Sequence, residues 1–360
     1  DLTAEIERFA PLSLQESYDN AGLLVGQPNK EITKALVTLD ITEEVLQEAI
    51  DVKADIIIAH HPVIFKGLKR LTGSNEIERV VIKAIQHDIA LYAAHTNIDN
   101  VREGVNKKIA DKLGLTDVKV LKPAAGLLRK LVVFCPTDAA EHVRNAMFRA
   151  GAGHIGNYDS CSFNLEGKGS FRAGEGADPY VGEVDKLHFE EEVRVESIYP
   201  VYLETKIIRE MITAHPYEEV AYDIYPLGNT YEAVGSGMMG KLPEPLSTKD
   251  FLQKVKDVFG AGCIRHTKAV SDSVKKIAIC GGAGSFLIED AIRSGADVFI
   301  TGDVKYHDFF RAEGKILIAD IGHYESEQFT KELIFTILKQ KFTNFAPQIS
   351  KVNTNPVNYL

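Results

Sequence analysis

Short apolar runs alternate with helical patterns at both ends of this chain, and this alternation limits the fold more than any other feature. Helical patterns cover residues 42–53, 75–87 and 102–113 of the first part, and the alternation returns from about residue 235 onward. Strands that alternate with helices form a parallel or mixed sheet covered by helices. We therefore predict an α/β fold with a mixed sheet for the two ends of the chain.

The middle of the chain has a different pattern. Extended runs alternate with two helical patterns in the order β-α-β-β-α-β, at residues 131–135, 139–150, 160–165, 183–197, 203–214 and 221–225. This order is a ferredoxin-like plan. Glycines concentrated in residues 167–182 predict a flexible loop between the two central strands. We predict an inserted α+β domain over residues 126–232, with residues 1–125 and 233–360 together forming the other domain.

Two adjacent histidines, His60 and His61, follow the apolar run 55–59, where a buried strand should give way to a loop. Neighbouring side chains of a regular strand point to opposite faces. Both rings can therefore bind the same ion only where the pleat breaks. Otherwise each ring binds a different ion. Ligands bind at the carboxyl ends of strands in open parallel sheets, and Pro62 stops this strand. Taken alone, the pair fits two polar residues that close a strand equally well.

Two further apolar runs end in the same kind of residue. His95 and Asp99 follow residues 89–94, and His323 and Glu327 follow residues 316–319. Side chains four residues apart share one face of a helix, so His323 and Glu327 can bind the same ion. A single pair of this spacing is more often a surface pair. Three such strand ends together predict a metal site.

Five motifs carry a resemblance to a known family. They are Tyr18–Gly26, Ala59–Phe65, His95–Asp99, Gly153–Tyr158 and Gly322–Glu327. Together they resemble the Nif-three-like family, whose bacterial members are named GTP cyclohydrolase I type 2 homologues. The resemblance covers nearly the whole chain, and it implies a Nif-three-like domain built from the two ends.

The resemblance implies two divalent ions in each subunit. It places His61 and Asp99 on one ion, His60 and His323 on the other, and Glu327 as a bridge between them. Three protein ligands for each ion leave a position for water or substrate, which is typical of catalytic sites. Two carboxylates and two divalent ions leave a charge of about +2, which favours hydroxide and anionic groups. Zinc is our first choice, and iron, manganese or cobalt also suit these ligands.

Other residues near these strand ends have two interpretations each. His95 either orients a ligand or moves a proton, or it is a hydrogen-bonding residue behind the metal ligands. His307, in the loop after another apolar run, is a candidate for substrate contact. For Asp19 and Asp40 we favour capping or turn roles. The glycine-rich segment 280–285 either holds a phosphate or forms a tight turn, and we favour the turn.

The segment 214–222 resembles the corresponding stretch of PII and CutA-type domains, which assemble as trimers and often sense small molecules. Its His215 is next to a proline after a helical pattern, so we favour packing or capping over ligand binding. Members of the resembled Nif-three-like family form toroidal hexamers. A homohexamer is therefore the expected assembly.

Composition limits the partners. The chain has 41 basic and 51 acidic residues and a formal charge of −10, which argues against nucleic acid as a partner. No apolar stretch approaches the roughly 18 residues that span a membrane, and the start lacks a signal-peptide pattern, so we expect a cytoplasmic protein. The four cysteines are widely separated, which predicts free thiols rather than disulfides or a zinc knuckle.

Two functions remain open on the sequence. The first is a two-metal hydrolase acting on a small phosphorylated or heterocyclic substrate, and the resemblance implies a nucleotide, with GTP as the named candidate. The second is a metal-dependent metabolite-sensing or regulatory binding protein without catalysis.

Overall fold

The computed structural model describes all of residues 1–360 and is a mixed α/β structure with three sheets. It divides into two compact units. Residues 1–123 and 233–360 form one of them, here called the discontinuous unit, and residues 124–232 form the inserted unit. None of the helices combines the length and the apolar surface that a membrane-spanning segment requires.

The first sheet of the discontinuous unit has the strand order β1-β4-β3-β2-β15. Its strands are β1 (Gly22–Val25), β2 (Ala35–Thr38), β3 (Ile56–Ala59), β4 (Ala90–Ala93) and β15 (Gln348–Ile349). The three central strands and β15 run parallel, and β1 is antiparallel to β4. Every residue of β2, β3 and β4 is buried, as expected for strands of a parallel sheet covered by helices.

Helices α2 (Glu43–Asp51) and α3 (Glu76–Gln86) cover this sheet. Each begins at a residue whose side chain accepts a hydrogen bond from a free backbone amide of the first turn. Thr42 accepts from the Val45 amide at 3.3 Å, and Asn75 accepts from the Glu78 amide at 2.9 Å. The apolar faces of both helices pack in one core with side chains of β2, β3 and β4.

The second sheet has the order β11-β14-β13-β12-β10-β5. Its strands are β5 (Thr116–Ala125), β10 (Thr230–Ser247), β11 (Arg265–His266), β12 (Ser273–Ala283), β13 (Val298–Gly302) and β14 (Leu317–Asp320). Strands β12, β13 and β14 are parallel. The shorter helix α9 (Ile288–Arg293) packs in the core of this sheet, and α8 (Thr248–Phe259) joins β10 to β11.

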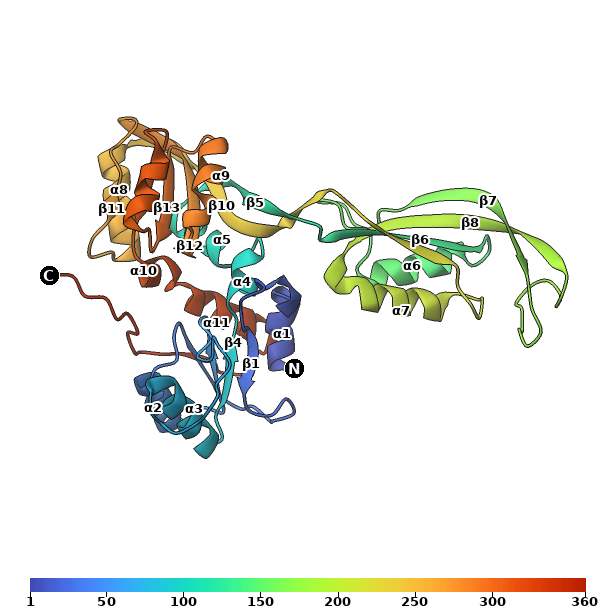
Figure 1. Cartoon of the computed structure of the whole chain (residues 1–360), viewed down its shortest axis with the longest axis horizontal. Coiled ribbons are helices and arrows are strands. Elements are labelled where there is room, and N and C mark those ends of the chain that lie inside the picture. Colours follow the sequence, from blue (N-terminus) through green and yellow to red (C-terminus); the bar gives the residue numbers. More distant parts are fainter. The chain divides into compact units, whose positions relative to one another are not determined.

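The remaining helices of the discontinuous unit connect and flank the two sheets. They are α1 (Leu2–Phe9), α4 (Thr96–Asn100), α5 (Val105–Leu113), α10 (His323–Glu327) and α11 (Thr330–Lys341), with 3-10 turns η1 (Leu12–Leu14), η3 (Ser285–Leu287) and η4 (Tyr306–Ala312). Helices α1 and α11 contact each other, so the first helix of the chain packs against a helix of its C-terminal part (Figure 1).

The inserted unit contains one antiparallel sheet with the order β7-β8-β6-β9. Its elements follow in the order β6 (Leu128–Pro136), α6 (Ala140–Ala150), β7 (Phe163–Arg172), β8 (Leu187–Pro200), η2 (Val201–Leu203), α7 (Glu204–Ala214) and β9 (Tyr222–Pro226). This is a split βαβ plan with both helices on one face of the sheet (Figure 1). The unit has its own core of buried residues from β6, β8, α6 and α7.

The glycine-rich stretch of the inserted unit differs from its prediction. We predicted a flexible loop over residues 167–182, but β7 continues through Gly167 and Gly169 to Arg172, paired with β8. A Cβ atom on Gly169 would collide with the carboxylate of Glu192 on the neighbouring strand. Gly169 therefore leaves room for the Glu192 side chain within a paired strand and does not mark a loop.

His215 has the packing role that we favoured. Its ring is buried, with Nε2 3.0 Å from the carbonyl of Phe134 and Nδ1 accepting from the Tyr217 amide at 3.1 Å. Both ring nitrogens are thus occupied inside the protein.

Candidate metal centre

Three strand ends bring the predicted ligands together. Strands β3 and β4 lie side by side in parallel, with Ala59 opposite Ala93, so His60 and His61 emerge beside the loop that leads to Asp99 on α4. After β14 the chain turns at Gly322, whose φ of 96° favours glycine, and enters α10. This short helix carries His323 and Glu327 one turn apart.

One group of ligand atoms contains His61, His323 and Glu327. The Nε2 atoms of the two histidines are 3.2 Å apart, and each lies 3.0 Å from Oε2 of Glu327. Of two further groups, one contains His60, His61 and His95, and the other contains His60, Asp99 and the same Glu327 oxygen. Here Nε2 of His60 lies 3.7 Å from Oδ1 of Asp99 and 3.6 Å from Oε2 of Glu327.

These separations suit ligands that share an ion. Ligand atoms about 2.0–2.1 Å from a tetrahedral zinc ion lie about 3.3 Å from one another. The separations of 3.0–3.7 Å between the ligand atoms given above are close to this value. His60 Nε2 and Asp99 Oδ1 are buried and have no hydrogen-bond partner in the protein. A buried polar atom without a partner is costly, and a bound cation would satisfy both atoms. The residues present therefore fit a metal centre.

The resemblance implied that His61 and Asp99 hold one ion and that His60 and His323 hold the other. In the structure Nε2 of His61 lies 3.2 Å from that of His323, and Nε2 of the fully buried His60 lies 3.7 Å from Oδ1 of Asp99. Which ligands share an ion stays a prediction, because the groups overlap in their residues. Glu327 Oε2 lies within 3.6 Å of Nε2 of all three histidines.

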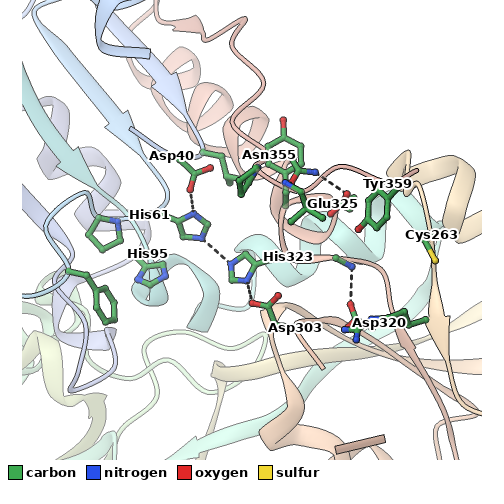
Figure 2. A pocket seen from close by; sticks show the side chains of 18 residues that line it. Asp40, His61, His95, Cys263, Asp303, Asp320, His323, Glu325, Asn355 and Tyr359 are labelled. Carbon is green, nitrogen blue, oxygen red and sulfur yellow. Dashed lines mark hydrogen bonds and ion pairs between the residues drawn. The ribbon is translucent and has the colours of Figure 1, made fainter. Parts of the chain in front are cut away.

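Each of these histidines is oriented by a hydrogen bond at its other nitrogen. Nδ1 of His61 lies 2.7 Å from Asp40, Nδ1 of His323 lies 2.7 Å from Asp303, and Nδ1 of His60 donates to the carbonyl of Ala94 at 2.9 Å. Figure 2 shows His61 and His323 facing each other with the two carboxylates behind them. Such partners fix the tautomer so that Nε2 is free to bind a metal. We favoured a capping or turn role for Asp40; it stands in a bend after β2, and its carboxylate contacts His61 and Thr354.

His95 lies at the edge of the same cluster. Its ring is 5.3 Å from that of His60 and 5.4 Å from that of His61, and its Nδ1 lies 2.7 Å from Asp19. The Asp19 side chain is fully buried and also accepts from the Thr96 amide at 3.0 Å. Asp19 thus orients a histidine in addition to closing a turn.

The charges of the cluster are coupled. Burial opposes protonation of His61, but hydrogen bonds to Asp40 and Glu327 raise its pKa to about 10. Burial likewise opposes protonation of His323, and Glu327 with Asp303 raises its pKa to about 9. Burial would raise the pKa of Glu327, but the surrounding histidines hold it well below its ordinary value. Protonated imidazoles therefore balance the buried carboxylate, and a divalent ion would replace that charge and release protons.

Burial also raises the pKa of Asp99, and the neighbouring Glu327 raises it further. Two buried carboxylates this close repel each other unless positive charge lies between them. The cluster therefore favours the binding of cations between its carboxylates.

The glycine-rich segment 280–285 lies against this cluster, but it is not the tight turn that we favoured, because β12 continues through it to Ala283 with an irregularity of pairing after Ile279. Gly282 has a φ of 63°, and a Cβ atom there would collide with the carboxylate of Glu327. The amides of Gly281, Gly282 and Gly284 already donate to Asn106, Ser326 and Thr301. No free amide of these three is left for a phosphate.

A cavity of about 880 Å³ opens beside the cluster. His61, His95 and His323 line it together with Phe65 and Tyr324. His307 does not line it, because it lies exposed on η4 between the rings of Tyr306 and Phe310.

Sequence reasoning missed several residues of the cavity wall. Asp303 follows the end of β13, so the strand-end signal used for the histidines was present there too. Glu325, Asn355 and Tyr359 also line the cavity (Figure 2). Asn355 and Tyr359 belong to an irregular segment with no periodicity that would indicate its position.

Known proteins resemble this chain over its whole length. A family model described as Duf34/NIF3 (NGG1p interacting factor 3) matches residues 1–356. A GTP cyclohydrolase 1 type 2 homolog of Halalkalibacterium halodurans is 42% identical over 98% of this chain and 96% of its own length. The homolog of the same name from Bacillus subtilis has the same identity and coverage. A crystal structure of a Bacillus cereus protein related to NIF3 matches with 40% identity and a TM-score of 0.88, covering 100% of this chain and 98% of that one.

Proposed function

Since this chain belongs to the Duf34/NIF3 family, we propose that it is a two-metal hydrolase of a small phosphorylated or heterocyclic substrate. One observation carries the proposal. Five ligand atoms from three strand ends converge, and two of them are buried without any partner in the protein.

His61, His323 and Glu327 would hold one divalent ion, and His60, Asp99 and Glu327 would hold the other. Two such ions supply a water-derived nucleophile near neutral pH and polarise the bond that it attacks. Zinc is the first choice for this ligand set, with iron, manganese and cobalt as alternatives. The protein contributes fixed ring orientations, because Asp40, Asp303 and the Ala94 carbonyl hold the three Nδ1 atoms.

His95 is the candidate catalytic residue of the protein itself. Asp19 holds its Nδ1, so Nε2 is available to a substrate atom beside the cluster. The cavity volume of about 880 Å³ lies within the roughly 300–1,000 Å³ of small-molecule sites, which suits a nucleotide or a similar ligand. The names of the relatives make GTP the first substrate to test.

The test replaces ligands one at a time. Asp99→Ala and Glu327→Ala should each lose bound metal and abolish turnover of GTP or of a panel of nucleotides, while the assembly stays intact by light scattering. Glu313→Ala, an exposed glutamate on the surface, is the matched control and should keep both metal and activity. A metal-loaded wild-type protein that leaves the whole panel unchanged would remove the hydrolase proposal.

A metal-dependent sensing or regulatory protein is the second candidate. The observation in its favour is the inserted unit, which has a core of its own and supplies none of the clustered ligands. If metal removal changes oligomerisation or metabolite binding and no substrate is turned over, this second function is the correct one.

The assembly is part of the proposal. The inserted unit has the split βαβ order that we associated with PII-like trimers, and we propose a homohexamer. A monomer in light scattering at micromolar protein would contradict it.

A further inference from the structure

A cluster of unpaired cations follows the first pair of metal-site histidines. Lys66, Lys69 and Arg70 are all exposed, and none of them forms an ion pair or a hydrogen bond with another side chain. We call residues 66–70 the basic loop. Three free cations within five residues stand out in a chain whose formal charge is −10.

The basic loop leaves directly from the wall of the cavity. Phe65, the residue before it, lines the cavity, and its ring lies 6.2 Å from that of His95. The backbone just before it is also fixed, because the Asn20 side chain donates to the Ile64 carbonyl at 2.6 Å. The loop therefore begins at a fixed point of the cavity rim.

A single buried carboxylate fixes the segment that follows the loop. Glu78, only 5% exposed, accepts from the amide and hydroxyl of Thr72 at 2.8 Å each and from the amide and hydroxyl of Ser74 at 3.1 and 3.0 Å. Asn75 donates to the same carboxylate at 2.9 Å. The segment is thus held at both ends while its cationic side chains stay free, whereas cations that serve only solubility need no such fixed backbone.

The rest of the cavity wall has the opposite charge. Asp40, Asp303, Asp320 and Glu325 line it (Figure 2). Arg265 is the only lysine or arginine in the lining, and it is paired with Asp320. An anionic ligand that extends beyond the metal centre would be repelled along this wall and attracted toward the basic loop.

We propose that the basic loop binds the phosphate chain of the substrate through Lys66, Lys69 and Arg70, at the rim of the cavity. The ligand class is therefore a polyphosphate or polyphosphate ester. This inference rests on the proposed function in one respect, because the other end of the ligand lies at the metal centre.

Binding of inorganic tripolyphosphate and of orthophosphate to the metal-loaded protein tests the inference without any need for turnover. The variant Lys66→Gln/Lys69→Gln/Arg70→Gln removes three exposed charges and should fold normally. The matched control is Lys249→Gln/Lys339→Gln/Lys341→Gln, which removes the same charge from exposed helix positions outside the cavity lining. Calorimetric titration at two salt concentrations gives both the affinities and their salt dependence.

We expect the loop variant to bind tripolyphosphate at least about tenfold more weakly, since each hydrogen bond to a charged group is worth about that factor. Its orthophosphate affinity and metal content should stay within about twofold of wild type, and its salt dependence should be weaker. Equal tripolyphosphate affinity in the loop and control variants would overturn the inference. That outcome would leave the metal-site proposal standing, because the Asp99→Ala test measures bound metal and turnover and does not involve the loop.

Discussion

At the scale of single residues, the carboxylates that contact the candidate metal ligands affect how those ligands bind a cation. Asp40 and Asp303 touch His61 and His323 through Nδ1, so each carboxylate fixes a ring and increases the basicity of its free nitrogen. Burial would raise the pKa of Asp40, but its hydrogen bond to His61 holds that pKa below the ordinary value. The carboxylate is therefore ionised at neutral pH and favours a cation bound to His61.

Replacing Asp40 should weaken metal binding in a graded way. Asp40→Asn keeps an acceptor for Nδ1 but loses the charge, and Asp40→Ala loses both, so we expect the alanine variant to be the weaker binder by about 10–100-fold relative to wild type. Competition with a chromophoric chelator measures the affinity. Asp272→Asn, an exposed aspartate of the same unit, is the control. Unchanged affinity in both Asp40 variants would contradict the orienting role.

Glu78 should give a pH-dependent contribution to stability. The amide and hydroxyl of Thr72 and those of Ser74 lower its pKa from 4.5 to about 2. Because the folded-state pKa is the lower one, this contribution is fully present above about pH 4.5 and is lost as the pH falls toward 2. Glu78→Gln should therefore be less stable than wild type at pH 7, and the difference should shrink between pH 4.5 and 2. Urea unfolding across this range measures it, with Glu44→Gln as the exposed control.

At the scale of elements, the apolar runs that end in potential metal ligands account for what the sequence predicted. Apolar runs before His60, His95 and His323 could be recognised as β3, β4 and β14 because buried parallel strands are continuously apolar. Which histidine faces which could not be predicted, because it depends on the rotation of α10 against β3. The role of residues 353–359 was equally hidden, since their contacts are distant in sequence and follow no period.

That last segment joins both halves of the discontinuous unit. β15 pairs with β2, and beyond it the Thr354 hydroxyl donates to Asp40 at 2.6 Å while Asn355 donates to Glu325 on α10 at 3.0 Å. It therefore touches the carboxylate that orients His61 and also the helix that carries His323.

Thr354→Val should loosen this contact without changing side-chain size. Loss of one hydrogen bond of about 0.5–1.5 kcal/mol predicts metal binding weaker by roughly 2–10-fold, less than for Asp40→Ala. Hydrogen exchange of residues 352–359 should also become faster. Thr336→Val, whose hydroxyl bonds only within α11, is the control. If these residues exchange at the wild-type rate in Thr354→Val, the Thr354 hydrogen bond does not hold the segment to the two halves of the unit.

At the scale of the whole molecule, the ligands come from both ends of the chain. His60, His61 and Asp99 precede the inserted unit, and His323 and Glu327 follow it. The sequence predicted the alternation of strands and helices at both ends, and the family resemblance implied that the two ends form one domain. Bound ions would therefore link two stretches of chain that the insertion separates.

Metal removal should consequently destabilise one unit and leave the other unchanged. An ion present at 100 times its dissociation constant stabilises the folded discontinuous unit by about 2.7 kcal/mol, and a chelator removes that contribution. The inserted unit has a separate core and no clustered ligand, so its unfolding should not respond. Calorimetry with and without chelator should show two transitions, of which one shifts to lower temperature. The Asp99→Ala/Glu327→Ala variant should lack this shift, and a single wild-type transition that shifts as a whole would mean that the two units unfold together.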